Sequence, residues 1–132
     1  MAHALECLLI DDDMDDHEIF SLALEDLDVH VKLTSVYNAN QAISLLESGT
    51  YSADFIFLDL NMPRVDGKQC LVEIKSIPAN KSVPVVIYST SSEIKDLVEV
   101  QQLGAEAYIV KSSSLKDLVA ALKDFFASKN MA

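Results

Sequence analysis

The chain of 132 residues has few basic side chains and no long hydrophobic run. Its 10 Lys and Arg residues stand against 21 Asp and Glu, which gives a formal net charge of -11. Because nucleic-acid backbones are bound by surplus Lys and Arg, this balance argues against a nucleic-acid partner. No apolar run approaches the roughly 20 residues of a membrane span, so we expect no membrane association.

Signals of export and of disulfide bonding are missing too. The segment MAHALECLLIDDD has neither the basic start nor the small-residue cleavage site of a signal peptide. Cys7 and Cys70 lie in hydrophobic segments without metal-ligand spacing, which is typical of buried thiols rather than of a disulfide or a zinc site. We therefore expect a cytoplasmic protein.

Half of its positions are hydrophobic, and residues 1–132 fit one domain with a core over about residues 5–127.

Four short, nearly continuous apolar runs predict buried strands, because strands of a parallel sheet are covered on both faces. They cover residues 5–10, 55–58, 85–88 and 107–110, and we expect all four to be interior. Residues 29–33 instead alternate apolar Val29, Val31 and Leu33 with polar side chains. This period of two predicts an edge strand with one face in water.

Between the strands the apolar spacing changes to the 3.6-residue period of helices. Five stripes follow this period: 20–27, 42–46 ended by Gly49, 71–77 ended by Pro78, 94–98 ended by Gly104, and 115–126. Five strands thus alternate with five helices. This order predicts an α/β fold, a doubly wound parallel sheet with helices on both faces and right-handed crossovers.

Polar side chains follow the strands at their carboxyl ends, where the working site of such a sheet lies. They are Asp11, Asp12 and Asp13 after the first strand, Asp59 after the third, Ser89 at the end of the fourth and Lys111 after the fifth. Neighbouring strands about 4.8 Å apart allow Asp12 and Asp59 to share a cation, and carboxylate, carbonyl and water oxygens suit Mg²⁺. We interpret Asp13, Asp15 and Asp16 as helix-capping and first-turn charges.

Four segments carry a family resemblance: LLIDDD, FIFLDLNMPRVDG, VPVVIYSTSS and GAEAYIVK. Over about residues 5 to 126 the chain resembles the receiver domain of bacterial response regulators, the CheY-like phospho-accepting part of two-component and phosphorelay systems. The resemblance implies a flavodoxin-like five-stranded sheet of strand order 2-1-3-4-5. It also implies roles for seven residues: Asp59 as phosphoryl acceptor, Asp11 and Asp12 as Mg²⁺ ligands with Asp59 and the Asn61 backbone carbonyl, Ser89 as switch hydroxyl, Lys111 as partner of the phosphoryl oxygens, and Tyr108 as the aromatic that changes rotamer.

The same resemblance implies partners. A receiver takes its phosphoryl group from a histidine kinase or a phosphotransfer protein, and it catalyses only its own phosphorylation and dephosphorylation. Its output is a change of surface on the fourth helix, fifth strand and fifth helix, where the candidates are Ile94, Lys95, Val98, Tyr108 and Lys116. This face would bind a downstream protein or form a homodimer. Because no effector domain follows Phe126, we expect a stand-alone receiver.

Two positions depart from the family pattern. Ser112 follows Lys111 where many receivers have proline after a cis bond, and a cis bond without proline costs roughly 3 to 4 kcal/mol. The Lys111–Ser112 bond is therefore either strained or trans. Thr90 stands where many receivers have a smaller residue, and a bulkier side chain there could slow the entry of attacking water.

Other readings of the sequence stay open. A phosphorylation-independent adaptor of the same fold is the main alternative. An aspartate-nucleophile phosphatase usually has a second aspartate where this chain has Asn61, and a flavin phosphate prefers a Gly-rich or Ser/Thr-rich loop where this chain places acids. The remaining polar residues have simpler expectations: His3, His17 and His30 exposed, Ser91 or Ser92 capping the fourth helix, and Ser112–Ser114 capping the last.

Overall fold

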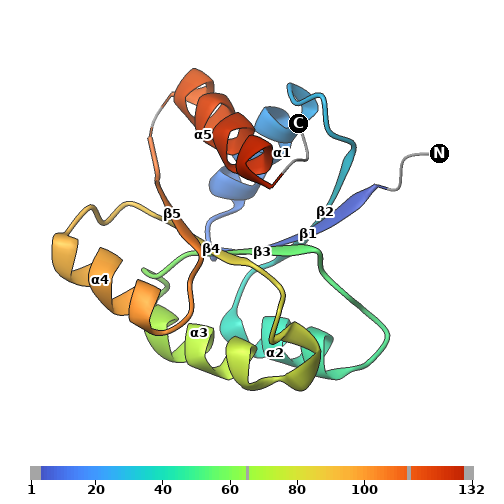
Figure 1. Cartoon of the computed structure of the whole chain (residues 1–132), viewed down its shortest axis with the longest axis vertical. Helices are drawn as coiled ribbons and strands as arrows, with labels where there is room; N and C mark the ends of the chain where they lie inside the picture. The colour runs from blue at the N-terminus through green and yellow to red at the C-terminus, as the bar shows by residue number, and fades with distance from the viewer. Residues whose placement is uncertain (1–3, 65, 113, 130–132) are drawn as a thin grey trace.

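Apolar strands and amphipathic helices alternate along the whole of the computed structural model, which describes residues 4–64, 66–112 and 114–129 (Figure 1). The elements are β1 (Leu5–Ile10), α1 (Met14–Glu25), β2 (Val31–Val36), α2 (Ala39–Glu47), β3 (Phe55–Leu58), α3 (Gly67–Ser76), the 3-10 turn η1 (Pro78–Asn80), β4 (Val85–Ser89), α4 (Ile94–Gln102), β5 (Ala107–Val110) and α5 (Leu115–Ser128). The predicted alternation is confirmed. Within the described residues, no helix has the length and apolar character needed to cross a membrane.

The five strands form one parallel sheet in the order β2-β1-β3-β4-β5. The predicted strand order 2-1-3-4-5 is therefore confirmed. The last residue of β1, Ile10, lies opposite Leu58 at the end of β3 and opposite Val36 at the end of β2. This register brings the residues that follow β1 and β3 to the same level at one edge of the sheet.

Two hydrophobic clusters cover the two faces of the sheet. Helices α1 and α5 lie on one face and α2, α3 and α4 on the other (Figure 1). Phe20 of α1, Phe57 of β3 and Phe126 of α5 are fully buried on the first face. Leu71 and Ile74 of α3 are fully buried on the second. Full burial of such side chains stabilises a fold by about 1.5–3 kcal/mol each, so both layers of helices are firmly fixed to the sheet.

Two strand predictions need correction. The alternating segment predicted at 29–33 is an edge strand, but β2 begins at Val31 and continues to Val36, because it pairs with all six residues of β1. The continuous apolar run at 107–110 predicted an interior strand, which was wrong: β5 forms the opposite edge of the sheet, as the order implied by the family resemblance requires. Its residues are continuously apolar, as in an interior strand, because α4 and α5 flank it. Val110 nevertheless remains 44% exposed.

Chain conformation at the helix ends follows the sequence signals. Gly49 and Gly104 follow α2 and α4 with φ angles of +76° and +106°, a region that glycine adopts without strain. Gly67 is required for another reason: a Cβ there would lie 2.5 Å from the backbone of Leu60. The loop from β3 to α3 therefore crosses the start of α3 at a distance that only glycine permits.

Candidate functional site

Side chains from four strand ends meet at the carboxyl edge of the sheet. Asp11 and Asp12 follow β1, Asp59 follows β3, Ser89 ends β4 and Lys111 follows β5. Backbone hydrogen bonds fix this edge: the Asp59 N–H donates to the Ile10 carbonyl (2.9 Å) and the Lys111 N–H donates to the Ser89 carbonyl (2.7 Å). The sheet thus brings together the residues that the sequence places there.

The Lys111 ammonium lies among three carboxylates. Its Nζ is 2.8 Å from Asp11 Oδ2, 2.7 Å from Asp16 Oδ2 and 3.2 Å from Asp59 Oδ2. The Asp11 and Asp59 side chains are at most 4% exposed and that of Lys111 is 11% exposed. Buried charges are stable only when paired, so this ammonium is what permits two buried carboxylates to lie together.

The assignment of Asp16 from sequence was incomplete. We expected Asp13, Asp15 and Asp16 to serve the start of α1, and Asp13 does cap it by accepting a hydrogen bond from the Asp15 N–H (2.9 Å). Asp16, in contrast, turns into the site and pairs with Lys111. Sequence spacing gave no sign of this pair, because its partners are 95 residues apart.

Burial dominates the electrostatics of Asp11. It raises the pKa of the Asp11 carboxyl from 3.8 to about 6, although hydrogen bonds from Lys111 and from the Asp13 N–H lower it. Burial also acts to lower the pKa of Lys111, but the carboxylates of Asp11, Asp16 and Asp59 more than offset it and the pKa is raised. The lysine is therefore charged at every physiological pH.

Three carboxylates fit a small divalent cation. One oxygen from each of Asp11, Asp12 and Asp59 lies within 4.8 Å of the others. Carboxylate oxygens are the hard ligands that Mg²⁺ prefers, so this group of three could hold one such ion. Asp11 Oδ2 is buried and its charge is paired with the Lys111 ammonium. The donor set, three carboxylates, suits a hard cation.

Asn61 links the loop after β3 to the end of β4. Its backbone N–H donates to Asp59 Oδ1 (3.0 Å), and its side-chain Nδ2 donates to the Ser89 hydroxyl (3.0 Å) and the Thr90 hydroxyl (3.3 Å). Ser89 is fully buried and Thr90 is exposed. The Ser89 oxygen accepts from Asn61, so its own hydrogen is free to turn toward another acceptor.

A second polar network joins the loop after β4 to α3 and α4. The Ser91 hydroxyl donates to Asp96 (2.6 Å), and Lys68 Nζ contacts Asp96 (2.7 Å) and Glu99 (3.0 Å). Hydrogen bonds from Lys68 and Ser91 lower the pKa of Asp96. The Tyr108 hydroxyl donates to the Ser91 carbonyl (2.8 Å), which joins β5 to the same loop. We did not predict this network, since surface Lys and Glu residues have no distinctive spacing.

The residues after β5 settle two sequence questions. The Lys111–Ser112 bond is trans, as are all peptide bonds in the described parts of the chain. Ser114 caps α5 by accepting from the Asp117 N–H (3.2 Å), and Ser112 donates to the Asp117 side chain (3.2 Å). Ser113, part of the predicted cap, lies outside the described residues. The expected capping of the fourth helix by Ser91 or Ser92 was wrong. Among the described residues Glu93 is the N-cap of α4 and no side chain makes a capping hydrogen bond there, because the Ser91 hydroxyl donates to Asp96 instead.

The histidine prediction was wrong at one position. His30 is exposed as expected and His3 lies outside the described residues. His17 is only 5% exposed, because its ring packs against Tyr37 and hydrogen-bonds to the Asp11 carbonyl. Cys7 and Cys70 are buried free thiols, as predicted, and burial raises the pKa of each to about 12.

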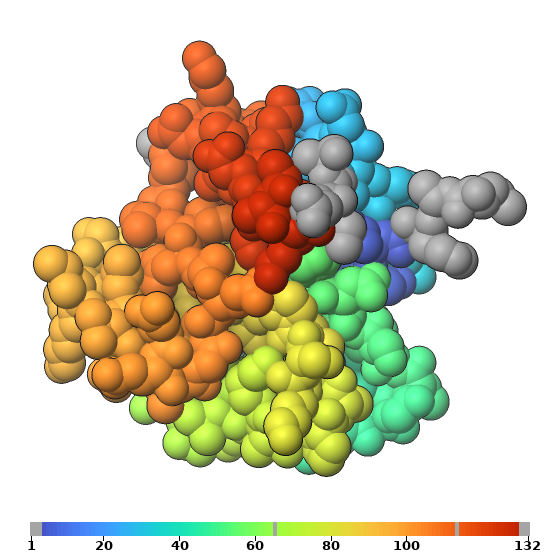
Figure 2. Space-filling model, viewed as in Figure 1, coloured from blue at the N-terminus to red at the C-terminus, as the bar shows by residue number. Residues whose placement is uncertain are grey.

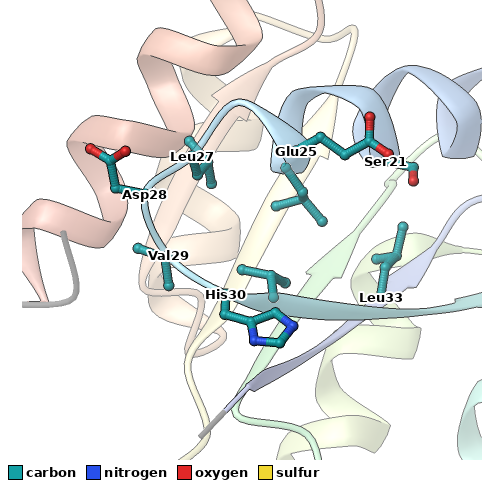
Figure 3. Close-up of a pocket in the computed structure, with 9 residues that line it drawn as sticks. Ser21, Glu25, Leu27, Asp28, Val29, His30 and Leu33 are labelled. Atoms are coloured by element: carbon teal, nitrogen blue, oxygen red, sulfur yellow. The ribbon is translucent and has the colours of Figure 1, made fainter. Parts of the chain in front are cut away.

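A surface groove of about 570 Å³ lies between the end of α1 and the start of β2, away from the aspartates (Figure 3). Leu27, Val29 and Leu33 contribute to its lining, with Glu25 on the helix and Asp28 on the connecting loop. None of the strand-end residues borders it. Reactive groups are concentrated at the carboxyl edge of the sheet, which is the candidate site.

Comparisons with known proteins agree with this geometry. The profile of the response regulator receiver domain family matches residues 7–123. Response regulator Rcp1 of Synechocystis sp. is 33% identical over 116 residues, which cover 84% of this chain and 79% of that protein. Some other relatives are longer, and the chain spans 41% to 50% of their length.

Two solved structures are similar along nearly the whole chain. The phosphorylated cyanobacterial phytochrome response regulator RcpA has a TM-score of 0.84 and 31% identity, and the match covers 94% of this chain and 92% of that one. The Mn²⁺-bound form of Rcp1 has a TM-score of 0.81 and 28% identity, with coverage of 93% and 92%. A phosphorylated form and a metal-bound form are therefore known for proteins of this shape.

Proposed function

The chain belongs to the response regulator receiver domain family, and on this premise we propose that it is a phosphorylation-controlled signalling module whose phosphoryl acceptor is Asp59. One observation carries the proposal. Asp59 is a buried carboxylate at the end of β3, and it faces a lysine ammonium and lies within ligand distance of two further acids. Helix capping or packing requires none of these contacts.

The donor would be a histidine kinase or a phosphotransfer protein, as is general for receiver domains. In the transfer, a carboxylate oxygen of Asp59 bonds to phosphorus as the P–N bond of a phosphohistidine breaks, and the imidazole nitrogen keeps the bonding electron pair. Such a reaction requires positioning and charge neutralisation more than further covalent chemistry. Lys111 is placed for this task, because its Nζ already contacts Asp59.

Asp11, Asp12 and Asp59, with the Asn61 backbone carbonyl, would hold the Mg²⁺ ion that we propose as cofactor. A bound Mg²⁺ supplies charge neutralisation for the phosphoryl oxygens. The clustering of the three carboxylates supports this assignment. The Mn²⁺-bound form of the similar Rcp1 supports divalent-cation binding in general rather than Mg²⁺ in particular.

Ser89 would respond to phosphorylation by changing its hydrogen-bond partner. A phosphoryl group adds charge and strong acceptor oxygens, and the Ser89 hydroxyl has a hydrogen free to donate to them. Its movement would change the contact with Asn61 and so the position of the loop that carries Ser91. Because Tyr108 donates to the Ser91 carbonyl, this loop is joined to the aromatic that we expect to change rotamer.

The output surface would be the face formed by α4, β5 and α5, which lie side by side in the space-filling view (Figure 2). Ile94 is 78% exposed and Val98 47% exposed, although both are apolar. Lys95 and Lys116 are exposed, and Tyr108 is half-buried. Exposed apolar side chains rimmed by charge are typical of protein-binding surfaces. The partner would be a downstream protein or a second copy of the chain.

Nuclear magnetic resonance tests this proposal. With Mg²⁺ already present, acetyl phosphate should shift the amide resonances of Thr90–Gln102 and of Tyr108 in the wild type, and should leave those of Asp59→Asn unchanged. Identical spectra before and after addition would contradict phosphorylation-controlled signalling. If a partner protein also binds equally with and without acetyl phosphate, the phosphorylation-independent adaptor is the correct reading.

A further inference from the structure

A buried histidine lies directly beside the acidic cluster. His17, in the first turns of α1, places its Nε2 2.7 Å from the Asp11 carbonyl oxygen. A carbonyl oxygen can only accept, so Nε2 carries the hydrogen and donates it. The His17 side chain on α1 thus holds the main chain by a hydrogen bond at Asp11, directly after β1.

Packing alone does not account for a histidine at this position. The ring is held by Tyr37, with ring centroids 4.4 Å apart and planes tilted by 48°. Its second nitrogen, Nδ1, is buried and has no hydrogen-bond partner in the described parts of the chain. A buried polar atom without a partner costs stability, which an apolar side chain of similar size would avoid. The hydrogen bond to Asp11 is what the imidazole supplies.

That hydrogen bond sets the direction of the peptide before Asp12. The Asp11 carbonyl and the Asp12 N–H belong to one rigid plane. Asp11 is already fixed on its other sides, because its N–H donates to the Val36 carbonyl (3.2 Å) and its Oδ1 accepts from the Asp13 N–H (3.0 Å). Asp12 is exposed, and its side chain makes no hydrogen bond or ion pair with the residues that the structure describes. Its position therefore depends on the main chain that precedes it.

We propose that His17 is a positioning residue for the cation site, which orients the Asp11–Asp12 peptide so that the Asp12 carboxylate faces Asp11 and Asp59. This inference rests on the proposed cation site. Loss of a group that orients metal ligands typically weakens metal binding 10- to 100-fold. Because His17 acts through the main chain on one ligand of three, we expect the weakening to be about tenfold, at the low end of that range.

Titration calorimetry with Mn²⁺ on the full chain, at a single pH, separates this role from a structural one. His17→Leu fills the site without a donor, and the Kd for Mn²⁺ should rise about tenfold. His17→Gln places an amide donor near the position of Nε2 and should bind within about threefold of the wild type. Leu24→Ala is the matched control, since it removes a buried side chain from the same helix about two turns away from His17. It should lower the melting temperature and leave the Kd unchanged.

Each outcome decides the matter. An unchanged Kd in His17→Leu, an equal loss in Leu24→Ala, or no recovery in His17→Gln would overturn the inference. Failure of the proposed function has a different signature, because the wild type would then bind no Mn²⁺, or Asp12→Asn would bind as well as the wild type. A second readout is the ¹⁵N resonance of His17 Nε2, which should shift on Mg²⁺ addition in the wild type and stay in place in Asp12→Asn. A resonance that does not move in the wild type would count against the coupling.

Discussion

Asp11→Asn should make the metal-free protein more stable at neutral pH. Burial raises the pKa of Asp11 from 3.8 to about 6, so keeping the carboxylate ionised at pH 7 costs the fold about 3 kcal/mol relative to the unfolded chain. Asparagine keeps the shape and the acceptor for the Asp13 N–H, but carries no charge. Lys111 retains Asp16 and Asp59 as partners. The free energy of unfolding should therefore rise by up to about 3 kcal/mol, or roughly 10 °C in Tm.

The pH dependence of this gain has a definite sign. Between the unfolded pKa of 3.8 and the folded pKa of about 6, the folded protein keeps a proton on Asp11 that the unfolded chain has lost. The contribution of Asp11 to stability is therefore complete below the unfolded pKa and is lost as the pH rises through 6. Asparagine has no such dependence, so the advantage of Asp11→Asn should shrink as the pH falls from 7 to 4.

Urea unfolding in EDTA, followed by circular dichroism for both proteins across this pH range, measures the difference directly. Other carboxylates are common to both chains and cancel. An advantage that is absent at pH 7, or equally large at pH 4, would refute the reasoning. Mg²⁺ at one hundred times its Kd should stabilise the wild type by about 2.7 kcal/mol, and should stabilise the variant less because a ligand is missing. Added metal should therefore close most of the gap.

Three further predictions follow from packing and charge. Gly67→Ala places a Cβ 2.5 Å from backbone atoms and should lower the free energy of unfolding by more than about 1 kcal/mol in a urea titration, while a variant as stable as the wild type would contradict the close approach. Lys68→Met removes both ion pairs to α4, a helix whose residues are largely exposed. Amide hydrogen exchange in α4 should therefore become faster than in the control variant Lys95→Met, and equal exchange rates in the two variants would refute this role of Lys68. Cys7 and Cys70 should react with a thiol reagent only after unfolding in urea, and labelling of the native protein would show that they are accessible.

Much of the fold can be predicted from the sequence because each element has a strong local signal. The continuous apolar run at 55–58 is β3 without change of bounds, and the helix stripe that Gly104 ends is α4. The predicted bounds of β2 were wrong, since pairing with β1 extends the strand beyond its alternating segment. The place of β5 at an edge depends on which strands pair, and burial periodicity alone does not contain that information.

The candidate site was predictable where it follows strand ends and unpredictable where helices supply its residues. Asp59 and Lys111 come directly after buried strands, so the topology of the sheet brings them together. Asp16 and His17 lie on α1, and their direction depends on how that helix packs on the sheet. A sequence cannot distinguish an aspartate that caps a helix from one that turns toward a lysine 95 residues away.

The most direct test of the central claim is the intact mass of the protein after incubation with acetyl phosphate. With Mg²⁺ present, the wild type should gain the mass of one phosphoryl group, and neither Asp59→Asn nor the wild type in EDTA should gain it. Lys111→Met, which keeps the acceptor but removes its ammonium partner, should gain it more slowly. A wild type that gains no mass, or an Asp59→Asn variant that gains as much, would contradict phosphoryl acceptance at Asp59.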